Sequence, residues 1–273
     1  MNKEGQPRAE PQTGLIRIEK SINPEVVWGK EFRIPSIVGE GSGLGFKIEN
    51  LHLPKDWETK IPKLKKINYE YIFNIFKEEC EKFELKPGIM KYDSGSILRE
   101  LTINTSPISR LYLDLEYYRE NKGGYKSENI MSPLVAIILE KIAARILSPL
   151  KEKEEGEEKE RGYPSIEGEF GRFYPRNLVI PKKFIKSGKA LYSQEAFTIE
   201  ASNILGRFGF TLNTTFFDKD NGLFTGIRLQ EGNSCSCNLE EEGEFNFKNV
   251  DDPERAAALF GVVAAYINHL LEK

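Results

Sequence analysis

The sequence is poor in the residues that most often build metal centres and disulfide frameworks. Its 273 residues include three cysteines and two histidines, His52 and His269. Three cysteines are too few for a disulfide framework, and no apolar run approaches the roughly 20 residues that cross a bilayer. The first 14 residues are polar and lack the apolar stretch of a signal peptide, so we expect a flexible tail there. These absences indicate a cytoplasmic protein in a reducing compartment, without a membrane attachment.

Two of the cysteines, Cys235 and Cys237, stand close together in the segment SCSC. On a strand, residues two apart point to the same face, so the two thiols could form half of a metal site. No second cysteine pair completes such a site, and a half-buried strand explains the spacing better. We therefore expect no bound cofactor at this motif.

Charge is distributed unevenly along the chain. The net charge of −3 argues against general attraction to nucleic acid, and residues 151–161, KEKEEGEEKER, contain no apolar side chain. Residues 170–194 contain no acid and six basic residues, at positions 172, 176, 182, 183, 186 and 189. The many lysines and glutamates with few glutamines are also typical of a thermophilic source.

Four segments carry apolar residues at spacings of three and four, which is typical of helices. Ser132 followed by Pro133, and Asp252 followed by Pro253, have the residue types that begin helices. Ser193 is a further helix start of the same kind. We expect helices over residues 67–83, 132–147, 193–208 and 252–273.

Between the expected helices, apolar and polar residues alternate as they do in half-buried strands. Residues 97–106 and 109–120 are predicted strands joined by a short turn with Pro107, and residues 208–232 are a predicted hairpin that turns at Asp220–Gly222. The expected fold class is α+β, with antiparallel sheets packed against helices.

The order helix, several strands, helix occurs twice, in residues 67–147 and 193–272. We therefore divide the chain into a tail (1–14), an N-terminal α+β half (15–150), a charged linker (151–162) and a C-terminal α+β half (163–273). Residue identity between the halves is slight, so a duplicated helix–β-meander–helix module is predicted from the order alone. One irregular α+β domain with a solvated insert is the alternative.

Four glycines alternate in the segment IPSIVGEGSGLGFKIENLHL, residues 34–53. A dinucleotide-binding loop needs a different glycine spacing between a strand and a helix, and a phosphate-binding P-loop needs Gly-Lys-Ser/Thr. The residues that follow alternate like a strand and end in proline. We interpret the glycines as a bend or close backbone contact between strands.

Residues 110–118, RLYLDLEYY, place Asp114 and Glu116 on one face of a predicted strand. This stretch and the long apolar helix after it resemble motif I of the archaeo-eukaryotic primase–polymerase superfamily. The resemblance implies that both carboxylates hold Mg²⁺ or Mn²⁺ for phosphoryl transfer, with Asp218 or Asp220 as a third acid. A strand with an acidic, solvent-facing side is the alternative.

Basic and aromatic residues alternate in residues 171–189, GRFYPRNLVIPKKFIKSGK. Arginine and lysine suit backbone phosphates, and aromatic rings suit stacked bases. The predicted contact residues are Arg172, Phe173, Tyr174, Arg176, Lys182, Lys183 and Lys186. The alternative is a surface strand that balances the acidic run before it.

From these patterns we expect a non-catalytic cytoplasmic protein that contacts nucleic acid, or a nucleic-acid-handling complex, through residues 171–189. One alternative is a primase- or polymerase-like nucleotidyl transferase or nuclease that uses Asp114 and Glu116 with Mg²⁺ or Mn²⁺. Another is a structural or assembly subunit whose apolar helices form a homodimer. A protein partner in place of nucleic acid stays open.

Overall fold

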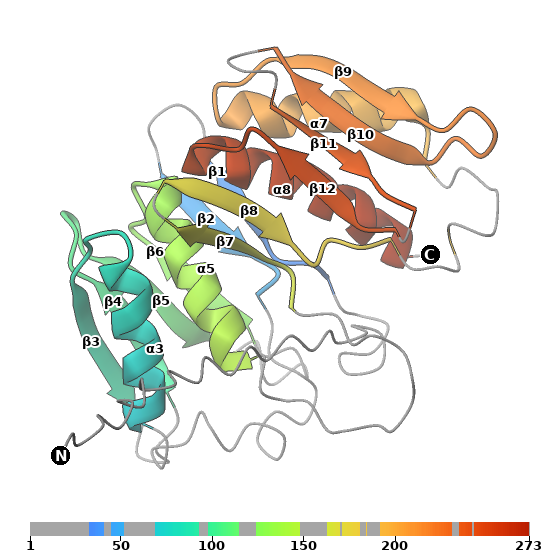
Figure 1. The fold of residues 1–273 in the computed structure, drawn as a ribbon. Coiled ribbons are helices and arrows are strands. Elements are labelled where there is room, and N and C mark those ends of the chain that lie inside the picture. The colour runs from blue at the N-terminus through green and yellow to red at the C-terminus, as the bar shows by residue number, and fades with distance from the viewer. Residues whose placement is uncertain are drawn as a thin grey trace, which may run out of the picture.

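The fold is described from a computed structural model. It describes residues 33–40, 45–51, 69–92, 98–114, 124–147, 163–169, 171–180, 184, 192–230, 235–241 and 243–272. Helices and antiparallel strands make up this part of the chain, so the expected α+β class is confirmed (Figure 1).

The described helices are α3 (Tyr69–Glu81), α5 (Pro133–Leu147), α7 (Gln194–Arg207) and α8 (Pro253–Leu271). All four lie where the apolar spacing predicted them. The start signals have the expected geometry, because Asp252 Oδ1 accepts a hydrogen bond from the Arg255 amide at 2.8 Å. Ser193 Oγ accepts from the Ala196 amide in the same way at the start of α7.

Each half contains one two-stranded hairpin and one four-stranded antiparallel meander. In the first half the hairpin is β1 (Ser36–Gly39) and β2 (Phe46–Glu49), and the meander is β3 (Pro87–Tyr92), β4 (Leu98–Ile103), β5 (Ser109–Asp114) and β6 (Gly124–Glu128). In the second half the hairpin is β7 (Ser165–Glu169) and β8 (Arg172–Arg176), and the meander is β9 (Leu212–Phe217), β10 (Phe224–Leu229), β11 (Ser236–Leu239) and β12 (Phe245–Lys248).

The hairpin lies beside the last strand of the meander in both halves. In the first half the Phe46 amide donates to the Ile130 carbonyl at 2.7 Å, and the Tyr125 amide donates to the Leu51 carbonyl at 2.9 Å. The second half repeats this antiparallel pairing: the Phe173 amide donates to the Val250 carbonyl at 3.2 Å, and the Phe245 amide donates to the Leu178 carbonyl at 3.1 Å.

The second half therefore repeats the element order of the first: hairpin, helix, meander, helix. Residue identity is concentrated in short matching segments, which the order of elements alone does not reveal. PSIVGE at residues 35–40 matches PSIEGE at 164–169, and FKIENL at 46–51 matches FYPRNL at 173–178. The backbone follows the match, because Asn50 and Asn177 have positive φ angles of 59° and 60°.

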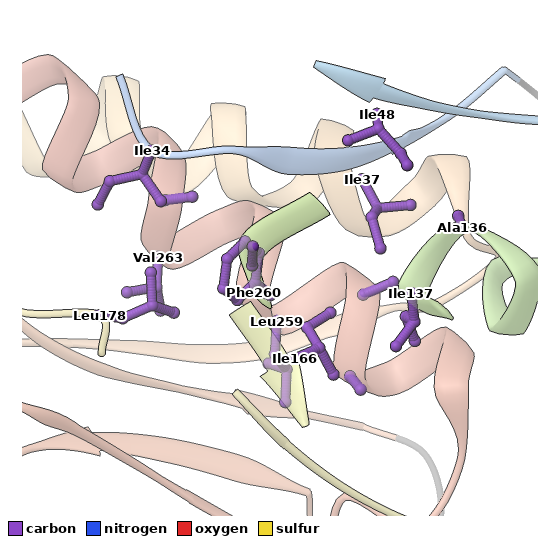
Figure 2. Close-up of a cluster of buried hydrophobic side chains, with 14 of the residues drawn as sticks. Ile34, Ile37, Ile48, Ala136, Ile137, Ile166, Leu178, Leu259, Phe260 and Val263 are labelled. Carbon is purple, nitrogen blue, oxygen red and sulfur yellow. The ribbon is translucent and has the colours of Figure 1, made fainter. Parts of the chain in front are cut away.

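Each hairpin packs against the final helix of the other half. β1 contacts α8, β7 contacts α5, and the two helices also contact each other. Figure 2 shows Ile37 of β1 above Ile137 of α5, and Ile166 of β7 beside Leu259 of α8. The buried apolar residues of both halves form one cluster. The halves thus share a core, and each completes the core of the other.

Two matching glycines allow each hairpin to pack closely against the other half. A Cβ added at Gly39 would lie 2.9 Å from the carbonyl oxygen of Arg207, and one added at Gly168 would lie 2.6 Å from Cζ of Phe83. In the first case the neighbour is the backbone of the last residue of α7, and in the second it is the side-chain ring of Phe83, which follows α3; both belong to the other half. A side chain at Gly39 would meet that backbone, and one at Gly168 would meet the ring.

Candidate nucleic-acid interface

The hairpin of β7 and β8 carries the described part of the predicted basic segment. Alternation along β8 exposes Arg172, Tyr174 and Arg176 on one side, while Phe173 and Pro175 point into the protein. We call the three exposed side chains the hairpin face. Tyr174 is 38% exposed, so part of its ring is accessible to a ligand.

Within the hairpin face, Arg176 contacts both the Tyr174 ring and one acid. The Arg176 guanidinium lies 5.4 Å from the centroid of the Tyr174 ring, which is a cation–π distance. Arg176 Nε is also 3.8 Å from Glu167 Oε2, and both of these side chains are more than half exposed. Because water screens such a pair, it holds Arg176 only weakly. The strand register places Arg172 opposite Glu169 of β7.

Phe173 belongs to the core and not to the hairpin face. Its side chain is 3% exposed, and its ring stacks on that of Phe83. The expectation that Phe173 stacks with a base is therefore wrong, because neither face of its ring is open. Lys182, Lys183 and Lys186 lie outside the described residues.

The matching hairpin of the first half carries a different set of side chains. Its second strand β2 exposes Lys47 and Glu49 where β8 exposes Tyr174 and Arg176. Lys47 forms an ion pair with Glu40, and that acid raises the pKa of the lysine. The two hairpins share a backbone, but only the second presents two arginines around an exposed aromatic ring.

The predicted metal-binding acids are only partly within the described chain. Asp114 ends β5, where the strand register pairs it with Gly124, and Glu116 lies outside the described residues. Asp218 lies in the turn of the other meander, where its Oδ1 accepts hydrogen bonds from two backbone amides. In the described ranges no three His, Cys, Asp or Glu side chains are grouped so that they could hold a metal ion.

Two glutamates in the first half are buried, and both have partners within the protein. Glu79 of α3 is 1% exposed and forms ion pairs with Lys82, Lys141 and Arg145. Burial favours a higher pKa for Glu79, but these three cations outweigh it and lower the pKa. Glu140 of α5 is equally buried and accepts a hydrogen bond from the Ile166 amide at 3.4 Å; burial raises its pKa to about 8.

The cysteine pair and the glycine-rich stretch are both parts of sheets. Cys235 and Cys237 are fully buried, and burial raises the pKa of Cys235 to about 12. The described part of the glycine stretch forms the β1–β2 hairpin, as the strand interpretation predicted. Gly41 and Gly43 lie outside the described residues.

Sequence reasoning did not identify a second exposed surface, the outer side of the β9–β12 meander. The inner side faces α7, because Thr215 Oγ1 lies 3.0 Å from Thr198 Oγ1 and the Phe217 ring packs on Phe197. Residues that alternate with these point outward. The register aligns them in two rows, which we call the sheet face: Phe216, Gly226, Asn238 and Asn246, and Thr214, Arg228, Ser236 and Lys248.

One sequence signal could have revealed the sheet face. The four strands LNTTFF, FTGIRL, SCNL and FNFK contain no aspartate or glutamate, in a chain with 42 acidic residues. Their polar positions hold asparagine, threonine, serine, arginine and lysine. Recognising this requires the register of all four strands, which determines the residues that share a face.

None of the described helices is both long enough and apolar enough to cross a membrane. Comparison of the chain with protein-family models, with curated proteins and with solved structures yields no match in any of the three. The site must therefore be interpreted from its own geometry and chemistry.

Proposed function

We propose that this protein is a non-catalytic cytoplasmic nucleic-acid-binding protein that contacts its ligand through the hairpin face. The observation that carries the proposal is the alternation on β8, which exposes Arg172, Tyr174 and Arg176 on one side of the strand. Residues two apart on a strand are separated by about 6.7 Å. Both arginines thus flank the tyrosine at a distance that their long side chains can bridge.

The chemistry of these three residues suits a phosphate backbone with accessible bases. Each guanidinium can donate two parallel hydrogen bonds to one phosphate, and the exposed tyrosine ring offers a surface on which a base can stack. The strand register places one acid, Glu169, opposite Arg172, and a second acid, Glu167, forms a solvent-exposed pair with Arg176. A phosphate can displace such a pair at low cost.

The proposal is tested by fluorescence anisotropy with a labelled oligonucleotide at low salt. Arg172→Ala/Arg176→Ala is expected to raise the Kd about tenfold or more, since each charge-assisted hydrogen bond contributes about 1.5–3 kcal/mol. Lys47→Ala/Lys77→Ala is the matched control, because it removes two exposed cations elsewhere and leaves the hairpin face intact. Equal Kd values for wild type and the arginine variant, or no binding by wild type, would overturn the proposal.

We do not propose the assembly alternative, because α8, one of the apolar helices that it invokes, gives it no support. It depends on apolar helices that are free to pair with a second copy. α8 is instead surrounded by its own chain: residues Ala256 to Ala264 are all buried, and α8 contacts α5, α7 and β1.

A further inference from the structure

We infer that the sheet face is a second contact surface and that its ligand is single-stranded nucleic acid with unpaired bases. The inference rests on the proposed function, in that both surfaces take nucleic acid as their ligand. It adds the class of nucleic acid and the residues that would recognise it.

The charge of the sheet face favours a polyanion. Arg228 and Lys248 are exposed, and neither forms an ion pair with any residue that the structure describes. They stand on β10 and β12 in the same row, with β11 between them, which separates their backbones by roughly 10 Å. Both side chains can therefore reach a phosphate backbone that crosses the strands.

Two described acids lie in the turns at one end of this meander. Asp218 and Glu240 belong to the β9–β10 and β11–β12 turns, and in a meander alternate turns lie at one end. Asp218 caps its own turn, and Glu240 accepts a hydrogen bond from Asn246 Nδ2 at 2.6 Å. The row with Arg228 and Lys248 is the farther of the two rows from these turns. At its own end of the strands, Asp251 and Asp252 follow β12, and both form ion pairs with Arg255.

The other row supplies groups that recognise bases. Phe216 is 37% exposed, and Arg228 lies 5.8 Å from the centroid of its ring. Beside Phe216 in the same row is Gly226, which has no side chain, and then the exposed amide of Asn238. A base can stack on the phenylalanine ring, and an asparagine amide can both donate to and accept from its edge. Paired bases in a duplex do not expose their faces in this way.

On the matching face of the first meander, basic side chains form ion pairs with an acid of the same face. There Lys91 Nζ lies 2.6 Å from Glu100 Oε2, and Arg110 Nε lies 3.7 Å from Glu100 Oε1. The Tyr112 hydroxyl donates to Glu128 at 2.9 Å. The two meanders thus share a topology but differ in charge, and only the second leaves its cations to an outside ligand.

Three variants of the full chain test the inference by fluorescence anisotropy, with a labelled oligo(dT) and a labelled duplex of equal length as probes. Phe216→Ala is expected to weaken oligo(dT) binding about tenfold with little change for the duplex, and Phe216→Trp to retain wild-type binding. Arg228→Ala/Lys248→Ala is expected to weaken oligo(dT) binding, whereas the charge-matched Lys91→Ala/Arg110→Ala should bind like wild type. Far-UV circular dichroism confirms that each variant is folded.

The possible outcomes separate this inference from the proposed function. If Arg172→Ala/Arg176→Ala weakens binding but Phe216→Ala and Arg228→Ala/Lys248→Ala do not, the sheet face is not a contact surface and the proposed function stands. If Phe216→Ala weakens duplex binding equally, or weakens the affinity for heparin, a polyanion without bases, as much as that for oligo(dT), the assignment to single strands is wrong. No oligonucleotide binding by wild type would overturn both.

Discussion

The rings of Phe83 and Phe173 stack with their centroids 5.9 Å apart and their planes 11° from parallel. Phe83 follows α3 of the first half, and Phe173 lies on β8 of the second. The matching pair is Phe208, which follows α7 of the second half, and Phe46 on β2 of the first half. Their ring centroids are 5.7 Å apart. The two contacts fasten each hairpin to the helix end of the other half.

The Phe83–Phe173 contact predicts a specific pattern of stability. Phe173→Ala should lower the free energy of unfolding by about 3–5 kcal/mol, because it removes a buried ring from the shared core. The double variant Phe83→Ala/Phe173→Ala should be about 0.5–1.5 kcal/mol more stable than the sum of the single effects predicts. Chemical denaturation of the four proteins measures this coupling.

A control for that cycle is available in the same chain. Phe83→Ala combined with Phe46→Ala changes one residue from each of the two aromatic pairs, so their effects should add. Full additivity of Phe83→Ala and Phe173→Ala would instead show that the contact does not hold the halves together.

The repeat could be predicted only in part from the sequence. The helix starts at Ser193 and Asp252 and the turn at Asp220–Gly222 are local signals, and each lies where it was predicted. The packing of each hairpin on the other half depends on contacts between residues far apart in the sequence, such as Phe83 and Phe173, which are 90 positions apart. No local pattern encodes them. The matching segments PSIVGE and PSIEGE were a usable signal of the repeat.

The candidate site was predictable to a smaller extent. Alternation correctly separates Arg172, Tyr174 and Arg176 from their neighbours once β8 is known to be a strand. The same alternation places Phe173 in the core, so treating 171–189 as one contact segment ignored the two sides of the strand. The sheet face could not be found without the register that aligns Phe216 with Asn238 through Gly226.

Glu140 predicts a pH dependence of stability. Burial raises its pKa from 4.5 to about 8 in the folded chain, so between these values the folded protein retains a proton that the unfolded chain releases. The free energy of unfolding should therefore fall as the pH rises from about 4.5 to 8, by at most about 1.4 kcal/mol per pH unit. Above pH 8 this contribution is lost.

The contribution of Glu140 is isolated by comparison with Glu140→Gln, which cannot titrate. Urea denaturation of both proteins at several pH values gives the difference, and groups common to both cancel. We expect Glu140→Gln to gain stability over wild type as the pH rises toward 8. A difference that does not vary with pH would show that Glu140 has an ordinary pKa.

The three thiols should be unreactive in the folded protein. Cys80, Cys235 and Cys237 are all buried, and burial raises the pKa of Cys80 to about 12 and also that of Cys237. Only the thiolate is nucleophilic, so Ellman's reagent should titrate all three cysteines in denaturant and none in native buffer. Fast reaction of one thiol in native buffer would contradict the buried positions.

Glu167 should weaken the binding of an oligonucleotide to the hairpin face. Its carboxylate lies 3.8 Å from Arg176 Nε, and at that separation in water an ion pair contributes about 1 kcal/mol at most. Glu167→Gln should therefore tighten oligonucleotide binding by up to about fivefold, with the larger gain at low salt. Anisotropy at two salt concentrations measures this, and Glu241→Gln in the β11–β12 turn is the matched control. Weaker binding by Glu167→Gln would mean that Arg176 contacts no phosphate.

The central claim, that Arg172 and Arg176 contact phosphates, is tested most directly by the salt dependence of binding. The Kd for an oligo(dT) probe is measured by fluorescence anisotropy across a range of salt concentrations for wild type and for Arg172→Ala/Arg176→Ala. Each phosphate contact on a single strand contributes about 0.7 to the slope of log K against log salt. The double variant is predicted to have a slope shallower than wild type by about 1.4, and identical slopes would contradict the claim.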